Sequence, residues 1–90
     1  MRERQPALPN GSAPTFTALQ GQYLAFIHTY TKLHRVAPAE ADIQRYFRVT
    51  APAVHQMVLT LAQRGFISRE PGRPRSIKVL VPPEQLPELE

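Results

Sequence analysis

Apolar side chains recur every three or four residues from Leu19 to Leu33, which is the spacing of one face of an amphipathic helix. This face comprises Leu19, Tyr23, Phe26, Ile27, Tyr30 and Leu33. Thr17 precedes the pattern and Gln20 stands three residues later, so the two side chains can cap the first turn reciprocally. The pattern predicts a helix over residues 17–35 with this face buried.

Two shorter helical patterns follow, separated by a three-residue link at 48–50. The first, residues 39–47, has acidic side chains in its first turn and an apolar side made of Ile43, Tyr46 and Phe47. A link of this length is typical of the tight turn in a helix-turn-helix.

The last of the three helices is expected over residues 52–64. Thr50 can serve as its N-cap, Pro52 suits a first turn that needs no N–H, and Gly65 can end it. The buried stripe comprises Val54, Val58 and Leu61, with Met57 on its flank, whereas Gln56, Leu59 and Gln63 fall on the far side.

Two β-strand patterns complete the folded part of the chain, at residues 66–69 and 76–81. A turn rich in proline and arginine, residues 71–75, lies between them. The predicted fold class is therefore mainly α with a small β-hairpin, a three-helix winged helix-turn-helix.

Prolines gather near both ends, which predicts a flexible leader at residues 1–15 and an unpacked, acidic, Pro-rich tail at residues 82–90. The winged helix domain is expected to occupy residues 16–81.

The formal net charge of +4 understates the basic character of the domain, because the last nine residues carry three glutamates and no cation. Residues 1–81 therefore carry +7. Five cations fall close together at the end of the third helix and on the hairpin: Arg64, Arg69, Arg73, Arg75 and Lys78. This cluster, placed directly after a helix-turn-helix, favours double-stranded DNA as the partner.

Several other function classes are disfavoured. The chain has no cysteine, which is consistent with a reducing cytoplasm, and no apolar run is long enough to span a membrane. Neither His28 nor His34 has an Asp, Glu or Cys partner at metal-ligand spacing, and no arrangement supports catalysis. We expect no metal, no cofactor and no enzymatic activity, and a cytoplasmic location.

The candidate DNA-binding residues fall into two groups. The recognition-helix group lies at the start of the third helix, where base edges or phosphates come within reach. It comprises Thr50, Ala51, Pro52, His55 and Gln56. The second group supplies positive charge for phosphates and comprises Arg48, Arg69, Arg73, Arg75 and Lys78. Gln56 is the candidate base reader, since its amide can pair with adenine.

The body of the chain is similar to the N-terminal DNA-binding domain of the LexA repressor family. The matching residues are Phe16 and Thr17, Pro38, Leu61 with residues 64–67, and the wing strand at 75–80. This resemblance implies a DNA-binding transcriptional repressor. Members also carry a C-terminal self-cleavage domain that dimerises them; the resemblance does not extend to it, so a homodimer remains open. Ala51, Pro52, Ala53, His55 and Gln56 replace the polar and acidic groups common in the family, so its operator is not expected here.

A second interpretation remains open, in which the winged helix docks an acidic protein partner instead of DNA. The exposed position expected for Leu59 and the proline-rich ends favour this alternative, whereas the basic wing favours DNA.

Overall fold

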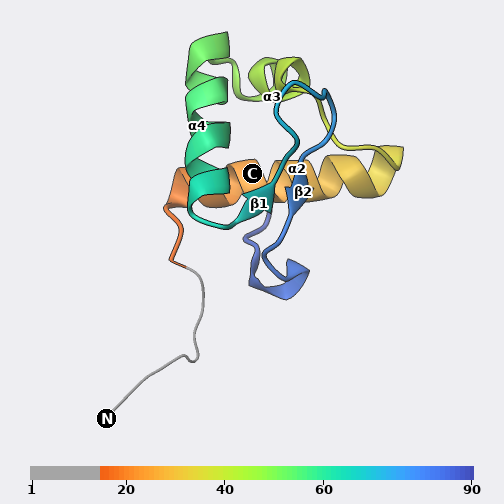
Figure 1. The fold of residues 1–90 in the computed structure, drawn as a ribbon. Coiled ribbons are helices and arrows are strands. Elements are labelled where there is room, and N and C mark those ends of the chain that lie inside the picture. Colours follow the sequence, from red (N-terminus) through yellow and green to blue (C-terminus); the bar gives the residue numbers. More distant parts are fainter. Residues whose placement is uncertain (1–14) are drawn as a thin grey trace.

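The computed structural model describes residues 15–90, so all but the last residue of the expected leader lies outside the described residues. Three α-helices are followed by a two-stranded antiparallel hairpin and a short 3-10 helix. Their bounds are α2 (Ala18–His34), α3 (Glu40–Phe47), α4 (Ala51–Gln63), β1 (Ile67–Ser68), β2 (Lys78–Val79) and η1 (Pro83–Gln85). Figure 1 shows α4 standing across one end of α2, with α3 beside both and the hairpin in front. This arrangement confirms the predicted winged helix-turn-helix.

The capping predicted for α2 is confirmed. Gln20 N donates to Thr17 Oγ1 over 3.1 Å, and Thr17 N donates to Gln20 Oε1 over 2.9 Å. The helix ends at Arg35, whose left-handed backbone (φ 63°) lets its N–H donate to the Thr31 carbonyl.

The predicted apolar face of α2 is correct in the middle of the helix and wrong at both ends. Tyr23 and Ile27 are buried, as is Leu24, which the pattern had left out, whereas Leu19 and Leu33 are 54% and 72% exposed. The elements packed on α2 cover only its central turns, because its buried residues lie between Gln20 and Ile27.

Helix α4 follows its prediction closely, with each end one residue earlier than expected. Val54, Val58 and Leu61 are fully buried, and Thr50 Oγ1 caps the helix by accepting from Ala53 N over 3.2 Å. Gly65, with φ of 79°, follows the helix in the left-handed conformation that glycine adopts most readily.

The hairpin is shorter than the sequence pattern predicted. Only Ile67 with Val79 and Ser68 with Lys78 are paired, although Leu80 N also donates to the Phe66 carbonyl. The turn between the strands contains two prolines and a left-handed arginine, which prevent a longer ladder. Alternate residues of the second strand pattern still face the core, as predicted.

The expectation of an unpacked tail is wrong. Leu86 and Leu89 pack against the core, and the Gln22 amide holds the tail at two points. Its Nε2 donates to the Glu88 carbonyl and its Oε1 accepts from Glu90 N, both over 2.9 Å. Apolar residues three apart after a 3-10 turn give this segment an inward side, which its proline content had concealed.

Aromatic side chains join the tail, α2 and α3. Tyr23 stacks on Phe47 with ring centroids 4.3 Å apart, and Phe26 stacks on Tyr46 at 4.5 Å. Tyr46, expected in the core, is instead 43% exposed, and its hydroxyl donates to the Glu90 carbonyl over 2.7 Å.

Candidate nucleic-acid interface

The first two turns of α4 form an open surface with few polar groups. Thr50, Ala51 and Pro52 are exposed at its start, and Gln56 and Leu59 are exposed further along the same helix. The stripe formed by Val54, Val58 and Leu61 faces the core and fixes this orientation. The side chains that sequence reasoning assigned to recognition are therefore accessible, and Gln56 is the one among them with an amide.

A groove of about 370 Å³ separates the start of α4 from the turn of the hairpin, which we call the wing (residues 69–76). On the helix side it is lined by His55 of α4, by Pro38 and Ala39 of the connector, and by Glu40, the first residue of α3. On the other side it is lined by Arg69, Arg73 and Arg75. Four of the predicted site residues thus come together in one place, which we call the wing groove.

His55 has a side-chain partner in the wing groove. Its Nδ1 lies 3.2 Å from both carboxylate oxygens of Glu40, which belongs to the first turn of α3. Sequence reasoning missed Glu40 as a site residue and treated it only as a helix-start carboxylate. The two residues are fifteen positions apart, and only the crossing of α3 and α4 brings them together, so the sequence offered no sign of the contact.

Arg75 is held within the domain. Its Nη1 donates to the Tyr30 hydroxyl and to the Ala37 carbonyl, each over 3.2 Å, and forms an ion pair with Asp42 at the same distance. The Ala39 N–H donates to Asp42 over 2.9 Å, and this bond, with the guanidinium groups of Arg45 and Arg75, holds the pKa of Asp42 below its usual value.

The other wing cations have more freedom. Arg73 donates to Glu70 over 3.0 Å, but both side chains are about two-thirds exposed, so the pair is weak and accessible. Arg69 is partly buried on the wall of the wing groove, and none of the described residues forms an ion pair with it.

Arg48 and Lys78 lie outside the wing groove. Arg48 ends α3 with φ of 58° and is exposed beside Arg45, whereas Lys78 is exposed on β2 and lies beside His28 and Thr31 of α2. The structure therefore does not gather all predicted cations at one point.

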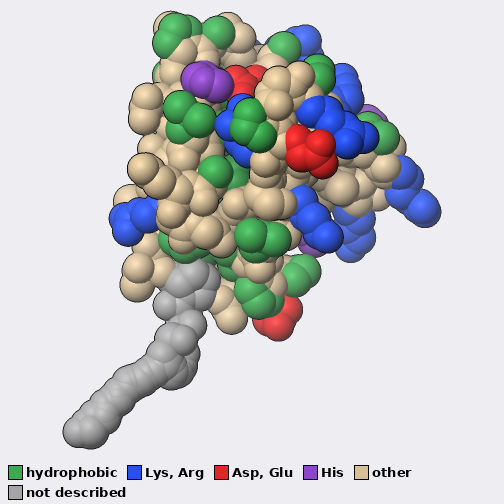
Figure 2. Space-filling model, in the orientation of Figure 1, with side chains coloured by type: hydrophobic (Ala, Val, Ile, Leu, Met, Phe, Trp, Pro, Cys, Tyr) green, Lys and Arg blue, Asp and Glu red, His purple; other side chains and the backbone are tan. Residues whose placement is uncertain are grey.

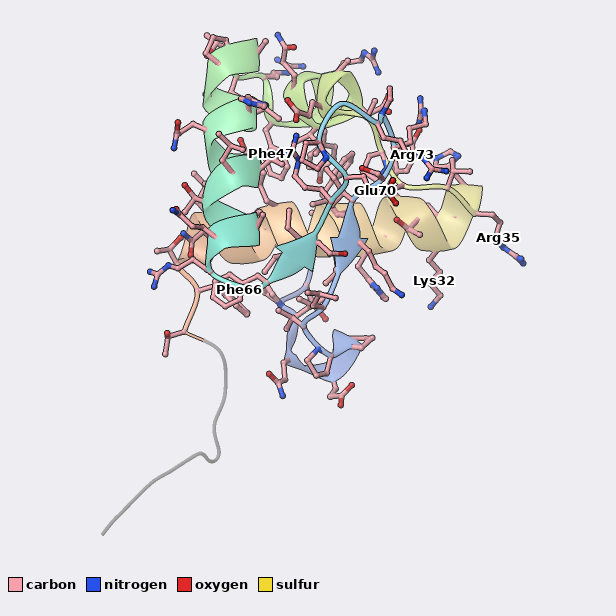
Figure 3. All side chains as sticks on the ribbon, viewed as in Figure 1. Lys32, Arg35, Phe47, Phe66, Glu70 and Arg73 are labelled. Carbon is pink, nitrogen blue, oxygen red and sulfur yellow. The ribbon has the colours of Figure 1, made fainter. Side chains whose placement is uncertain are left out.

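Positive charge also extends to the end of α2, which sequence reasoning did not include. Lys32 and Arg35 project from that end in Figure 3, beyond the wing that carries Arg73. Figure 2 shows Lys and Arg side chains spread over the wing side of this face, whereas the α4 side carries few. On this face, positive charge therefore lies mainly beside the wing and not along α4.

Two features are absent from residues 15–90. No group of three or more His, Cys, Asp or Glu side chains is placed to hold a metal ion there. Nor does any helix in this part of the chain have both the length and the apolar character that crossing a bilayer requires.

Comparison with known proteins identifies the family of this fold. Residues 13–76 match the model of the LexA DNA binding domain, which is well over half of the chain. The chain belongs to this family. The LexA DNA binding domain match spans all three helices, the first strand and the wing, and so contains every residue that lines the wing groove except Ile77.

Several LexA repressors are similar to this chain. That of Thermosipho africanus is 35% identical over 68 residues, covering 76% of this chain and 34% of the relative. Those of Thermosipho melanesiensis and Bartonella quintana are 33% and 32% identical, covering 71% and 78% of this chain and 32% and 30% of the relatives. The chain therefore spans about a third of the length of the curated relatives it matches.

Proposed function

We propose that this domain binds duplex DNA in a sequence-specific manner and represses transcription. It is located in the cytoplasm and acts as a binding module, without a cofactor or a catalytic step. The start of α4 enters the major groove, and the wing contacts the adjacent backbone. The observation that carries this proposal is the wing groove, where His55 on α4 faces Arg69 and Arg73 across a gap of about 370 Å³. A phosphate strand passing the wing would meet positive charge there.

Base recognition rests on very few side chains. Gln56 is exposed on α4 and its amide can donate to and accept from an adenine edge. Ala51 and Pro52 are exposed next to it and offer only apolar contact, of the kind that suits a thymine methyl group. Phosphate contacts from Arg69, Arg73, Arg48 and Lys78 then supply most of the affinity.

The similar proteins are named LexA repressors, which supports repression as the role of this chain. A homodimer would double the small number of base contacts and fits a two-fold symmetric site.

A salt titration of binding to duplex DNA tests the proposal. We expect the logarithm of affinity to fall linearly with the logarithm of salt concentration, and Arg73→Ala to reduce the slope by about one unit. Arg64→Ala is the matched control, because Arg64 is exposed at the opposite end of α4 from Thr50, and it should leave the slope unchanged. Flat or undetectable binding would refute the proposal and favour docking of an acidic protein partner.

A further inference from the structure

The contact between Glu40 and His55 has no evident role in folding. The side chains are 37% and 52% exposed, and exposed ion pairs contribute little to stability because water screens them. Yet the contact holds the one imidazole of α4 in place, at the wall of the wing groove. Glu40 is also the only acidic residue among those that line this groove.

We propose that Glu40 is a positioning residue, which holds the His55 ring so that it contacts a DNA phosphate in the wing groove when the ring is protonated. This inference rests on the proposed DNA-binding function. It adds a named partner for His55 and a dependence of DNA affinity on pH.

The two protonation states of His55 present different groups to the wing groove. In the neutral ring, the Nδ1–H donates to Glu40, so Nε2 can only accept a hydrogen bond and repels a phosphate oxygen. In the imidazolium, Nε2 carries a proton and can donate to that oxygen while Nδ1 remains on Glu40. Only the charged ring therefore bridges the carboxylate and the phosphate.

The charged groups around the ring determine the direction of the effect. Glu40 of α3 is the acidic group in contact with the ring, and Arg69, Arg73 and Arg75 of the wing are the cations that line the same groove. A bound phosphate offsets the arginines and adds a second negative neighbour to the ring. DNA binding then takes up a proton, and affinity rises as pH falls.

The test is the pH profile of DNA affinity between about pH 5 and 8, at fixed ionic strength, on random-sequence duplex DNA. For the wild-type domain we expect affinity to fall with rising pH, by at most about tenfold per pH unit for one linked proton. His55→Gln should remove this dependence. His34→Gln is the matched control, because His34 is an exposed histidine that packs at a tilt against Tyr30 at the C-terminal end of α2, and it should retain the wild-type profile.

Glu40→Gln tests the positioning role itself. It removes the carboxylate that holds the ring at Nδ1, so the rise in affinity at low pH should become smaller, while Glu40→Asp should partly restore the wild-type profile. A purely structural role for Glu40 predicts a changed thermal midpoint and an unchanged pH profile, and that result would overturn the proposal. So would a His55→Gln variant with the wild-type profile. If the wild-type domain binds no DNA at any pH, the proposed function itself has failed.

Discussion

The guanidinium of Arg75 and the carboxylate of Asp42 lie 3.2 Å apart and join the wing to the start of α3. The same guanidinium donates to the hydroxyl of Tyr30 on α2 and to the Ala37 carbonyl in the connector. The left-handed backbone of Arg75, with φ of 58°, lies between the turn and β2. One side chain therefore ties the wing to both helices beneath it, and we infer that Arg75 positions the wing as its main role.

Arg75→Ala distinguishes positioning of the wing from direct phosphate contact. We expect DNA affinity to fall while the salt slope stays at its wild-type value, because the lost contacts lie within the protein. Arg73→Ala gives the contrasting result, a slope lower by about one unit. A one-unit fall in the Arg75→Ala slope would instead make Arg75 a phosphate contact, as the sequence suggested.

The order of the elements, and most of their bounds, could be predicted from the sequence, since they depend on local features. The reciprocal cap at Thr17, the cap at Thr50 and the stop at Gly65 are each encoded within four residues. Errors arose where a distant element decides the outcome. The exposure of Leu19 and Leu33 depends on how much of α2 its neighbours cover, and a helical pattern carries no such information.

In the candidate site, too, local features could be predicted and contacts between distant residues could not. The exposure of Gln56 and His55 could be predicted from a helical wheel, because α4 has one clear buried stripe. The contacts of His55 with Glu40 and of Arg75 with Tyr30 could not, since they join residues fifteen and forty-five positions apart. The sequence identified cations by their density along the chain, whereas only the fold reveals which of them already have partners.

Asp42→Asn should make the free energy of unfolding of the domain depend less on pH under acidic conditions. The pKa of Asp42 is lowered in the folded protein, mainly by the Ala39 N–H and further by the two arginines. Ionised Asp42 therefore stabilises the fold at pH values above its pKa in the unfolded chain, which is about 3.9. This contribution is lost as pH falls through the lowered pKa. Urea unfolding should therefore show a wild-type advantage at neutral pH that shrinks below about pH 4.

Glu84→Gln is the control for this comparison, because it also removes one carboxylate, from the exposed tail. An Asp42→Asn variant whose stability follows the wild type at every pH would show that the contacts of Asp42 contribute nothing to folding.

Gln22→Ala should release the tail from α2. The substitution removes the acceptor for Glu90 N and the donor to the Glu88 carbonyl, and each bond is worth about 0.5–1.5 kcal/mol at most because the site is exposed. We expect faster hydrogen exchange at the Glu90 amide and faster cleavage after Glu88 by a glutamate-specific protease, with a small change in the global unfolding midpoint. Gln85→Ala, in the exposed 3-10 turn, should leave the exchange of Glu90 at its wild-type rate.

Gln56→Ala should weaken binding to the preferred DNA sequence and leave binding to random duplex unchanged. Gln56 is exposed on α4, and the loss of a bidentate contact to adenine costs about 1–3 kcal/mol of discrimination. The measurement compares affinities for a duplex selected by the wild-type domain with those for random duplex, at one salt concentration. Gln63→Ala, on the same exposed side but at the C-terminal end of α4, is the matched control and should behave as wild type. An equal loss on both duplexes would assign Gln56 to the phosphate backbone, and sequence preference would then rest on the shape of the DNA read by the wing.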